Sequence, residues 1–336
     1  MKAMLLRELG PVTSDSTPLE YGDVPDPVAA DGQVLIRVTA CGVCHTELDE
    51  IEGRTPPPKL PVIPGHQVVG VVTGGPMQGR RVGVAWIHSA CGVCRYCLAG
   101  NENLCEQFEA TGRDVDGGYA QFMIANSRFV HAIPDSLSNS QAAPLLCAGA
   151  VGYRALRLTN LTDGDNLGLT GFGASNHLVL KTARHLYPRS SVFVFSRNPQ
   201  ERKLALDLGA AWAGAIDETP PQKLDAVIDA TPVWTPVAQA LKHLAPGGRL
   251  VINAIRKEEV DKEVLLKLDY SSQLWMEKEI KTVANVTRRD VKEFLDLAAE
   301  ANIRPEVEEY DLKDANRALM DVKQGKIAGA KVLRVA

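Results

Sequence analysis

The stretch NLGLTGFGASNHLVLKTARHL, residues 166–186, decides the fold of the central part of the chain. Its first residues are typical of a short buried strand, the glycines indicate a tight turn, and the remainder has the spacing of an amphipathic helix. Strands that alternate with helices at short intervals predict a parallel sheet with crossover helices. The alternation continues with strands expected at 191–196, 225–231, 249–254 and 280–285 and helices at 201–210 and 237–248.

The residues on either side of this region have a different composition. The first 150 residues are rich in Gly, Pro and Val, and β-branched runs at 34–43, 68–74 and 81–87 have the pattern of strands. Near the other end, 291–303 has the pattern of a helix and 330–335 that of a strand. A length of 336 residues corresponds to about two domains, so we expect a β-rich domain beside the α/β domain.

Composition excludes several classes of protein. Lys and Arg number 37 against 41 Asp and Glu, and this net charge of −4 argues against a nucleic-acid-binding protein, which needs a basic surface. No apolar run approaches the roughly 18 residues of a membrane span, and the first ten residues lack the apolar core of a signal peptide. Seven cysteines are an odd number, which argues against a disulfide framework. We therefore expect a cytoplasmic protein, without nucleic-acid or membrane partners, whose cysteines bind metal.

Four of the cysteines follow the spacing C-x2-C-x2-C-x7-C, at Cys91, Cys94, Cys97 and Cys105. Four thiolates in one short loop suit a single tetrahedral ion, and the closed shell predicts a structural zinc ion rather than ordinary buried cysteines. An iron–sulfur motif has three residues before its last cysteine, not seven. A nucleic-acid-binding zinc ribbon is disfavoured, since the loop carries one base, Arg95, with Glu102 and Glu106 beside it.

The remaining cysteines and one histidine outline a second metal site. Cys41 and Cys44 lie at the end of one expected strand, His66 lies just before another, and Cys147 lies near the change in composition. Two thiolates and one imidazole leave one position of a zinc ion open, which is the arrangement of a catalytic zinc. The spacing does not choose between Cys41 and Cys44, and a core histidine with inert cysteines is the alternative.

The turn after the strand at 166–170 has the pattern of a dinucleotide-binding loop with one departure. Two glycines allow the tight turn and the close approach of a diphosphate to the helix, while an asparagine stands where a third glycine would permit close packing. A tight strand–helix turn without a ligand is the alternative. The residues expected to contact the cofactor are Gly171, Gly173, Ala174, Ser175 and Asn176.

The end of the next strand indicates which nicotinamide cofactor binds. An NAD site places Asp or Glu there for the ribose 2′-hydroxyl, whereas this chain has Ser196, Arg197 and Asn198. A hydroxyl and a guanidinium suit a 2′-phosphate, and the missing carboxylate removes a like charge. The sequence therefore predicts a preference for NADP(H) over NAD(H); an exposed loop arginine is the alternative.

Six motifs, in this order, resemble the zinc-dependent alcohol dehydrogenases of the medium-chain dehydrogenase/reductase superfamily, most closely their bacterial, cinnamyl-alcohol-dehydrogenase-like branch. They are GVCHTEL (42–48), PGHQVVG (64–70), CGVCRYCLAGNENLC (91–105), DGGYA (116–120), PLLCAG (144–149) and GFGASN (171–176). The resemblance covers most of the chain. It implies that Cys44, His66 and Cys147 bind the catalytic zinc ion, that the lobe at about 91–105 binds a second, structural one, and that Cys41 binds neither.

The resemblance also implies the arrangement of the domains. We expect an α/β protein in which residues 1–150 and 287–336 form a GroES-like β-rich catalytic domain with the zinc lobe. Residues 151–286 would form a Rossmann domain, a doubly wound parallel sheet that binds the dinucleotide. The active site would lie in the cleft, and the enzyme would be a homodimer or homotetramer.

The implied activity is hydride transfer between a primary aliphatic or aromatic alcohol and NADP⁺, or the reverse reduction of an aldehyde, with zinc as the Lewis acid. By the same resemblance, Thr46 begins the proton relay, His45 contacts the cofactor diphosphate, and Trp86 narrows the substrate pocket. The alternatives are a solvent-exposed His45 and a core Trp86.

Several residues depart from the family pattern. Gln67 stands where a glutamate usually follows the ligand histidine, Asp49 where a histidine often ends the relay, and Ala330 where an arginine contacts the cofactor. Asp49 either acts as a base or caps a helix. These departures leave a zinc-stabilised, non-catalytic binding protein as an alternative. The filled zinc positions argue against a zinc-free quinone or enoyl reductase.

Some residues belong to no motif. The segment EEVDKEVLLKLD (258–269) has the pattern of a solvated helix face. Four histidines are expected on the surface or on helix faces: His131, His177, His185 and His243.

Overall fold

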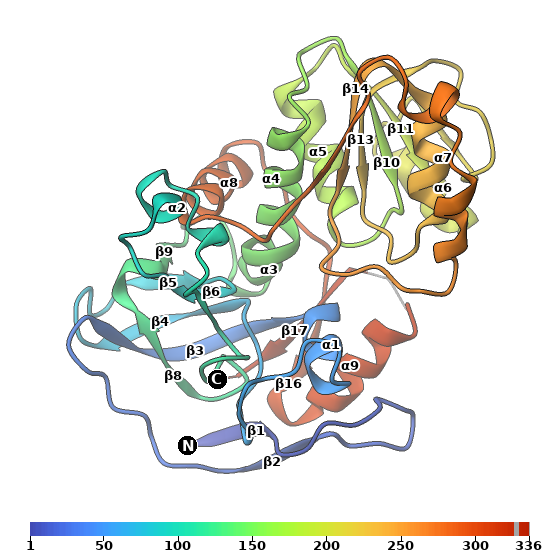
Figure 1. Cartoon of the computed structure of the whole chain (residues 1–336). Coiled ribbons are helices and arrows are strands. Elements are labelled where there is room, and N and C mark those ends of the chain that lie inside the picture. The colour runs from blue at the N-terminus through green and yellow to red at the C-terminus, as the bar shows by residue number, and fades with distance from the viewer. Residues whose placement is uncertain (326–328, 336) are drawn as a thin grey trace. The chain divides into compact units, whose positions relative to one another are not determined.

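The computed structural model describes residues 1–325 and 329–335, and the chain divides into two compact units (Figure 1). The first unit comprises Met1–Ala150 and Val286–Ala336, so it contains both ends of the chain. The second unit is the continuous segment Val151–Asn285. Among the described residues, no helix is long and apolar enough to cross a membrane.

The second unit is built on a sheet whose strands all run parallel, in the order β12-β11-β10-β13-β14-β15. Counted from the first strand of the unit this is the order 3-2-1-4-5-6, which confirms the predicted doubly wound sheet. The order reverses between β10 and β13, and ligands of such sheets bind beyond the carboxyl ends of the strands at this point. The strands are β10 (Asn166–Thr170), β11 (Ser191–Phe195), β12 (Trp212–Gly214), β13 (Leu224–Asp229), β14 (Leu244–Ile252) and β15 (Glu279–Thr282).

Helices cover both faces of this sheet because side chains alternate along each strand. In β11, Val192 and Val194 pack into one apolar cluster with α5, whereas Phe193 and Phe195 pack into a second cluster with α7. In Figure 1, α5 and α7 accordingly lie on opposite sides of the sheet. The helices of this region are α4 (Ala150–Leu158), α5 (Asn176–Leu186), α6 (Pro199–Asp207) and α7 (Thr235–His243).

The first unit is built on a mixed sheet in the order β16-β17-β3-β4-β5-β9, with β8 also paired to β3. The C-terminal strand β17 pairs antiparallel with the end of β3, where Leu333 faces Cys41, and so fixes the segment that leads into Cys44. The strands of this sheet are β3 (Gln33–Val43), β4 (Val68–Gly74), β5 (Arg81–Val84), β8 (Phe122–Asn126), β9 (Val130–Ala132), β16 (Val307–Asp311) and β17 (Ala330–Arg334).

Two short antiparallel pairs and several helices complete the first unit. The pairs are β1 (Lys2–Leu6) with β2 (Leu19–Asp23) and β6 (Ile87–Ser89) with β7 (Glu109–Ala110). The helices are α1 (His45–Ile51), α2 (Arg95–Leu98), α3 (Asn139–Pro144), α8 (Arg288–Glu300) and α9 (Ala315–Lys323).

Some elements differ from those predicted. The run at 81–87 is divided between β5 and β6, and the helix expected at 237–248 ends at His243 because Leu244 is already extended. The segment 258–269 contains only a short 3₁₀ helix, Lys262–Lys267, instead of an amphipathic helix. The carboxylate of Asp261 accepts hydrogen bonds from the backbone N–H groups of Trp234 and Thr235, so this segment is tied to the start of α7.

The expectation of a surface position for His131 is wrong. This residue lies in β9, the edge strand next to β5, and is 9% exposed because α8 packs against this strand. Burial, together with the neighbouring cation Arg288, lowers the pKa of His131 to about 4. The imidazole is therefore neutral in the folded chain at pH values at which the unfolded chain binds a proton.

We predict that His131 makes stability depend on pH on the acid side of neutrality. Between about pH 6.5 and pH 4 the unfolded chain binds the extra proton, so the free energy of unfolding falls as the pH drops through this window. His131→Gln should reduce that fall, measured by urea unfolding at a series of pH values. The control is the exposed His185→Gln, which should keep the wild-type pH dependence. An unchanged pH dependence in His131→Gln would contradict the assignment.

Candidate metal centres and dinucleotide turn

Three residues that are far apart in the sequence meet in the first unit. The Sγ atoms of Cys44 and Cys147 and a ring nitrogen of His66 all lie within 4.8 Å of one another. Cys44 Sγ is 3.8 Å from His66 Nε2. Two sulfurs and one nitrogen at these separations can bind one zinc ion and leave a fourth position open.

Local backbone features bring each of these residues to the site. Cys44 is the N-cap of α1, and its sulfur accepts the backbone N–H of Thr46. His66 follows Gly65, whose φ of +100° and contact with Tyr119 leave no room for a Cβ atom. Cys147 lies in a π-helical turn, Leu145–Gly149, a distortion that is frequent at functional sites.

Glu47 supports both Cys44 and His66, and the sequence analysis did not identify it. Its carboxylate is fully buried; Oε2 accepts the backbone N–H of Cys44 at 2.9 Å, and Oε1 lies 2.6 Å from His66 Nδ1. A carboxylate beside the second ring nitrogen of a histidine orients the first one toward a metal. The available signal was the spacing of a capping box, in which the residue three positions after the N-cap is Glu.

The other members of this neighbourhood have different environments. Cys41 is completely buried, and its burial, with the charge of Glu47, raises the pKa of its thiol well above the ordinary value. Its Sγ is not part of the three-atom group. His45 is exposed and Thr46 is half-buried at the first turn of α1.

The four clustered cysteines also converge. Their Sγ atoms all lie within 4.8 Å of one another, with Cys105 buried and the other three half-buried. Backbone N–H groups of Val93 and Cys94 lower the pKa of the Cys91 thiol to about 6, whereas burial and the neighbouring sulfurs raise that of Cys97 to about 12. Four thiolates this close together repel one another unless a cation lies between them, which is the chemistry of a closed metal site.

The dinucleotide turn lies at the carboxyl end of β10. Gly171 has φ of +73°, and around Gly173 no heavy atom of the described residues lies within 4 Å of where a Cβ would stand. The turn therefore has the open backbone that a diphosphate needs.

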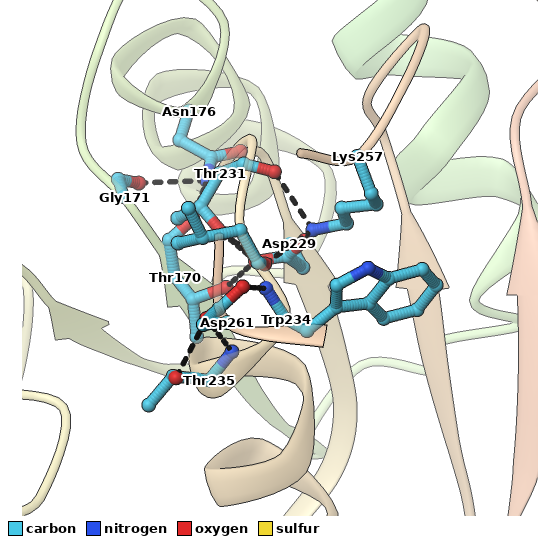
Figure 2. Close-up of polar contacts among 10 residues, drawn as sticks. Thr170, Gly171, Asn176, Asp229, Thr231, Trp234, Thr235, Lys257 and Asp261 are labelled. Carbon is cyan, nitrogen blue, oxygen red and sulfur yellow. Dashed lines mark hydrogen bonds and ion pairs between the residues drawn. The ribbon is translucent and has the colours of Figure 1, made fainter. Parts of the chain in front are cut away.

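Asn176 replaces the third glycine by holding this turn from inside. It is fully buried, and its Nδ2 donates to the carbonyl oxygens of Thr170 at 3.1 Å and Gly171 at 2.8 Å (Figure 2). The side chain thus uses the space beneath the turn and satisfies two backbone acceptors.

Comparison with known proteins identifies the family of the chain. Residues 30–135 match the alcohol dehydrogenase GroES-like domain, and residues 206–333 match the zinc-binding dehydrogenase family. The chain is 43% identical to the probable alcohol dehydrogenase AdhA of Mycobacterium tuberculosis, over 100% of this chain and 97% of the relative. The chain belongs to the zinc-binding alcohol dehydrogenases of the medium-chain superfamily.

Other relatives of this alcohol dehydrogenase family extend the comparison. An alcohol dehydrogenase of Geobacillus stearothermophilus is 34% identical over 94% of this chain and 96% of the relative. A cinnamyl alcohol dehydrogenase structure from Sorghum bicolor superposes with a TM-score of 0.82 at 26% identity, over 99% of this chain and 97% of the other. A Helicobacter pylori structure, described as complexed with NADP(H), has the same fold, with a TM-score of 0.85 at 22% identity over 99% and 97%.

Two residues that depart from the family pattern, Gln67 and Asp49, make defined contacts within the first unit. Gln67 is buried, and its side chain lies against Gly42, with Oε1 2.4 Å from where a Cβ of that glycine would stand. Asp49 lies inside α1 and not at its N-cap, and its Oδ1 accepts from Arg54 Nε at 2.5 Å.

The loop after β11 is held by a carboxylate of α6, Glu201, which was not among the predicted residues. Ser196 is buried, and its hydroxyl donates to Glu201 Oε2 at 2.5 Å, while Arg202 binds the Ser196 carbonyl oxygen at 2.9 Å. Arg197 and Asn198 are exposed. Arg197 forms no ion pair or hydrogen bond with the part of the chain that the structure describes. Glu201 lies in the first turn of α6, where the helix dipole stabilises a negative charge. Its carboxylate can therefore stabilise the helix without any contact to a cofactor.

Trp86 is half-buried between two different neighbours. Its ring centroid lies 5.2 Å from that of Phe108, at an interplanar angle of 45°. Glu50, which is also close, is 2% exposed, and burial with the charge of Glu47 raises the pKa of its carboxyl well above the ordinary value.

Proposed function

We propose that the chain is a two-zinc, NADP(H)-preferring dehydrogenase of primary alcohols that works equally as an aldehyde reductase. The observation that carries the proposal is the convergence of Cys44, His66 and Cys147, with the buried carboxylate of Glu47 behind the imidazole. A three-ligand site with one free position suits catalysis, and the Cys91–Cys105 lobe suits a second, structural zinc ion.

A zinc ion in the three-ligand site would supply Lewis acidity toward the oxygen of the alcohol or carbonyl group. The nicotinamide cofactor would supply the acceptor or donor of hydride. The chain's own residues would position these groups and move the proton. Glu47 holds the imidazole of His66, and the hydroxyl of Thr46 begins the proton path. His45 would contact the diphosphate of the bound cofactor.

The proposed substrate class rests on Trp86. The resemblance to the family implies that this indole lines the substrate pocket, where it would leave room for a carbon that carries one substituent and hinder a carbon that carries two. Its packing against Phe108 holds the ring at a defined tilt and so supports a fixed pocket wall. Aldehydes and primary alcohols therefore fit better than ketones and secondary alcohols.

We predict about two zinc ions per chain by elemental analysis of the purified protein. Cys147→Ala should lose one ion and more than about 100-fold in kcat/KM for aldehyde reduction. Cys97→Ser should lose the other ion and lower the midpoint of thermal unfolding. Cys41→Ala is the matched control: another thiol of the same region, expected to keep both ions. If Cys41→Ala loses zinc as Cys147→Ala does, the ligand assignment is wrong.

The proposed cofactor preference rests on opposing charges around Ser196. The exposed guanidinium of Arg197 is available to a 2′-phosphate, whereas the carboxylate of Glu201 is held beside Ser196 and opposes a second negative charge. We infer a preference for NADP(H) that Glu201 limits, so that NAD(H) is also used.

This balance predicts opposite effects of two substitutions on the ratio of kcat/KM for NADPH to that for NADH. Arg197→Ala should lower the ratio at least about tenfold, a change of about 1.4 kcal/mol, and Glu201→Gln should raise it. The control is Lys203→Ala, which removes a cation from α6, the helix that carries Glu201. Lys203 pairs with Asp207 at 2.7 Å, so its loss should leave the ratio unchanged. A wild-type preference for NADH would overturn the cofactor assignment and leave the zinc chemistry in place.

We propose further that the enzyme is a cytoplasmic homodimer or homotetramer. Free thiols as metal ligands suit a reducing compartment. Every residue of the edge strand β15 is exposed. Apolar side chains are exposed in and before this strand, at Leu266, Tyr270, Trp275, Met276 and Ile280. An unpaired edge beside apolar surface is typical of a subunit contact.

The oligomer proposal predicts a mass of two or four chains by light scattering coupled to size-exclusion chromatography. Ile280→Asp should shift the mass toward one chain, because a charge in an apolar contact is desolvated. Leu206→Asp, at an equally exposed leucine on α6, should leave the mass unchanged. A single-chain mass for the wild type would refute the oligomer.

A further inference from the structure

A buried lysine lies at the carboxyl edge of the second unit's sheet. The side chain of Lys257 is 8% exposed, and that of its partner Asp229, the last residue of β13, is fully buried. The ammonium group contacts Asp229 Oδ2 and donates to the carbonyl oxygens of Thr231 at 2.7 Å and Val233 at 2.9 Å (Figure 2). All three ammonium hydrogens therefore have partners, so this lysine has none left for a ligand.

The contacts continue from Lys257 to the dinucleotide turn. The other oxygen of Asp229 accepts the hydroxyl groups of Thr170 at 2.6 Å and Thr231 at 2.8 Å. Thr170 is the last residue of β10, directly before Gly171. The methyl group of Thr231 lies 3.0 Å from where a Cβ of Gly171 would stand. The loop after β13 therefore packs directly against the turn.

The loop 230–234 depends on this cation for its conformation. Two of its carbonyl oxygens point toward the same ammonium group, and without the cation they would lie beside an uncompensated buried carboxylate. The far end of the loop is tied separately, since Asp261 accepts the backbone N–H groups of Trp234 and Thr235 (Figure 2). Removing Lys257 would leave the carbonyl oxygens of Thr231 and Val233 without this donor in the part of the loop that contacts Gly171, where the Thr231 hydroxyl would still bind Asp229.

The position of this loop connects Lys257 to the place where the cofactor would bind. β10 and β13 are the strands between which the sheet order reverses, and a dinucleotide binds beyond their carboxyl ends. The charge of Asp229 is close to the turn that would receive an anionic diphosphate, and the cation of Lys257 neutralises it.

We propose that Lys257 is a positioning residue for the nicotinamide dinucleotide. It shapes the loop 230–234 against the Gly171 turn and neutralises the carboxylate beneath it. This inference rests on the cofactor binding in the proposed function. We expect the same effect on both cofactors, because the Gly171 turn would receive the diphosphate, which NADPH and NADH share.

A second ion pair in the same sheet, between the largely buried Arg249 and the exposed Glu279, provides the control. Arg249 donates from Nε and from an Nη atom to the carboxylate of Glu279, each at 2.9 Å, and to the carbonyl oxygen of Leu158 at 3.0 Å. This pair joins β14 to the first residue of β15, in register with Ala226 in the first half of β13 and three residues before the row that contains Asp229. Its loss should weaken the fold without reaching the turn.

The test is the equilibrium dissociation constant of NADPH and of NADH, measured by fluorescence titration of the full-length, zinc-loaded protein. Lys257→Met should raise both constants at least tenfold and by the same factor, with unchanged zinc content. Lys257→Arg, which keeps the charge, should recover part of the affinity. Arg249→Met should lower the urea midpoint and leave both constants within twofold of the wild type.

A double variant keeps the test decisive if Lys257→Met does not fold. Asp229→Asn with Lys257→Met removes the uncompensated charge but leaves the loop carbonyls unheld, so its constants should also be raised at least tenfold. Wild-type affinity in the double variant overturns the inference, and so does an equal loss of affinity in Arg249→Met. If the wild type binds neither dinucleotide, the proposed function is wrong. Failure of the proposed function is therefore distinguishable from failure of the inference about Lys257.

Discussion

The buried carboxylate of Glu47 is the constraint on which the three-ligand site depends. One of its oxygens accepts the N–H of Cys44 and the other lies 2.6 Å from the imidazole of His66. A carboxylate that is removed from water must be compensated by its neighbours. The start of α1, the orientation of the imidazole and the position of the Cys44 sulfur are therefore parts of one local structure, and β17 completes it by pairing with the end of β3.

The second unit uses a buried carboxylate in a comparable way. Asp229 joins the ends of β10 and β13 through hydroxyl groups, and Lys257 compensates its charge. Asn176 adds two hydrogen bonds beneath the glycine turn. In both units, a loop with little regular structure of its own is held by a polar group that is completely buried. Low dielectric surroundings strengthen such contacts and make the loss of any one partner costly.

Departures from the family pattern are concentrated near these groups. Gln67 packs against Gly42 as a neutral side chain, so Glu47 is the carboxylate beside the imidazole of His66. Asp49 pairs with Arg54 and does not cap α1, so the expectation of a helix cap at this position is wrong. Near the cofactor loop, Glu201 adds a negative charge that opposes Arg197.

The sequence by itself determined the elements whose partners are close along the chain. The spacing from Cys91 to Cys105, the turn at Gly171 and the strand–helix alternation are local patterns, and the structure contains each of them. The resemblance to the family implied that Cys147 meets Cys44, whereas only the tertiary structure decided that Glu47 meets His66 and Lys257 meets Asp229. The burial of His131 and the short 3₁₀ helix at Lys262–Lys267 also follow from contacts with remote segments. Periodicity and spacing report the geometry of one segment, whereas ion pairs and burial depend on how segments pack, which no local pattern encodes.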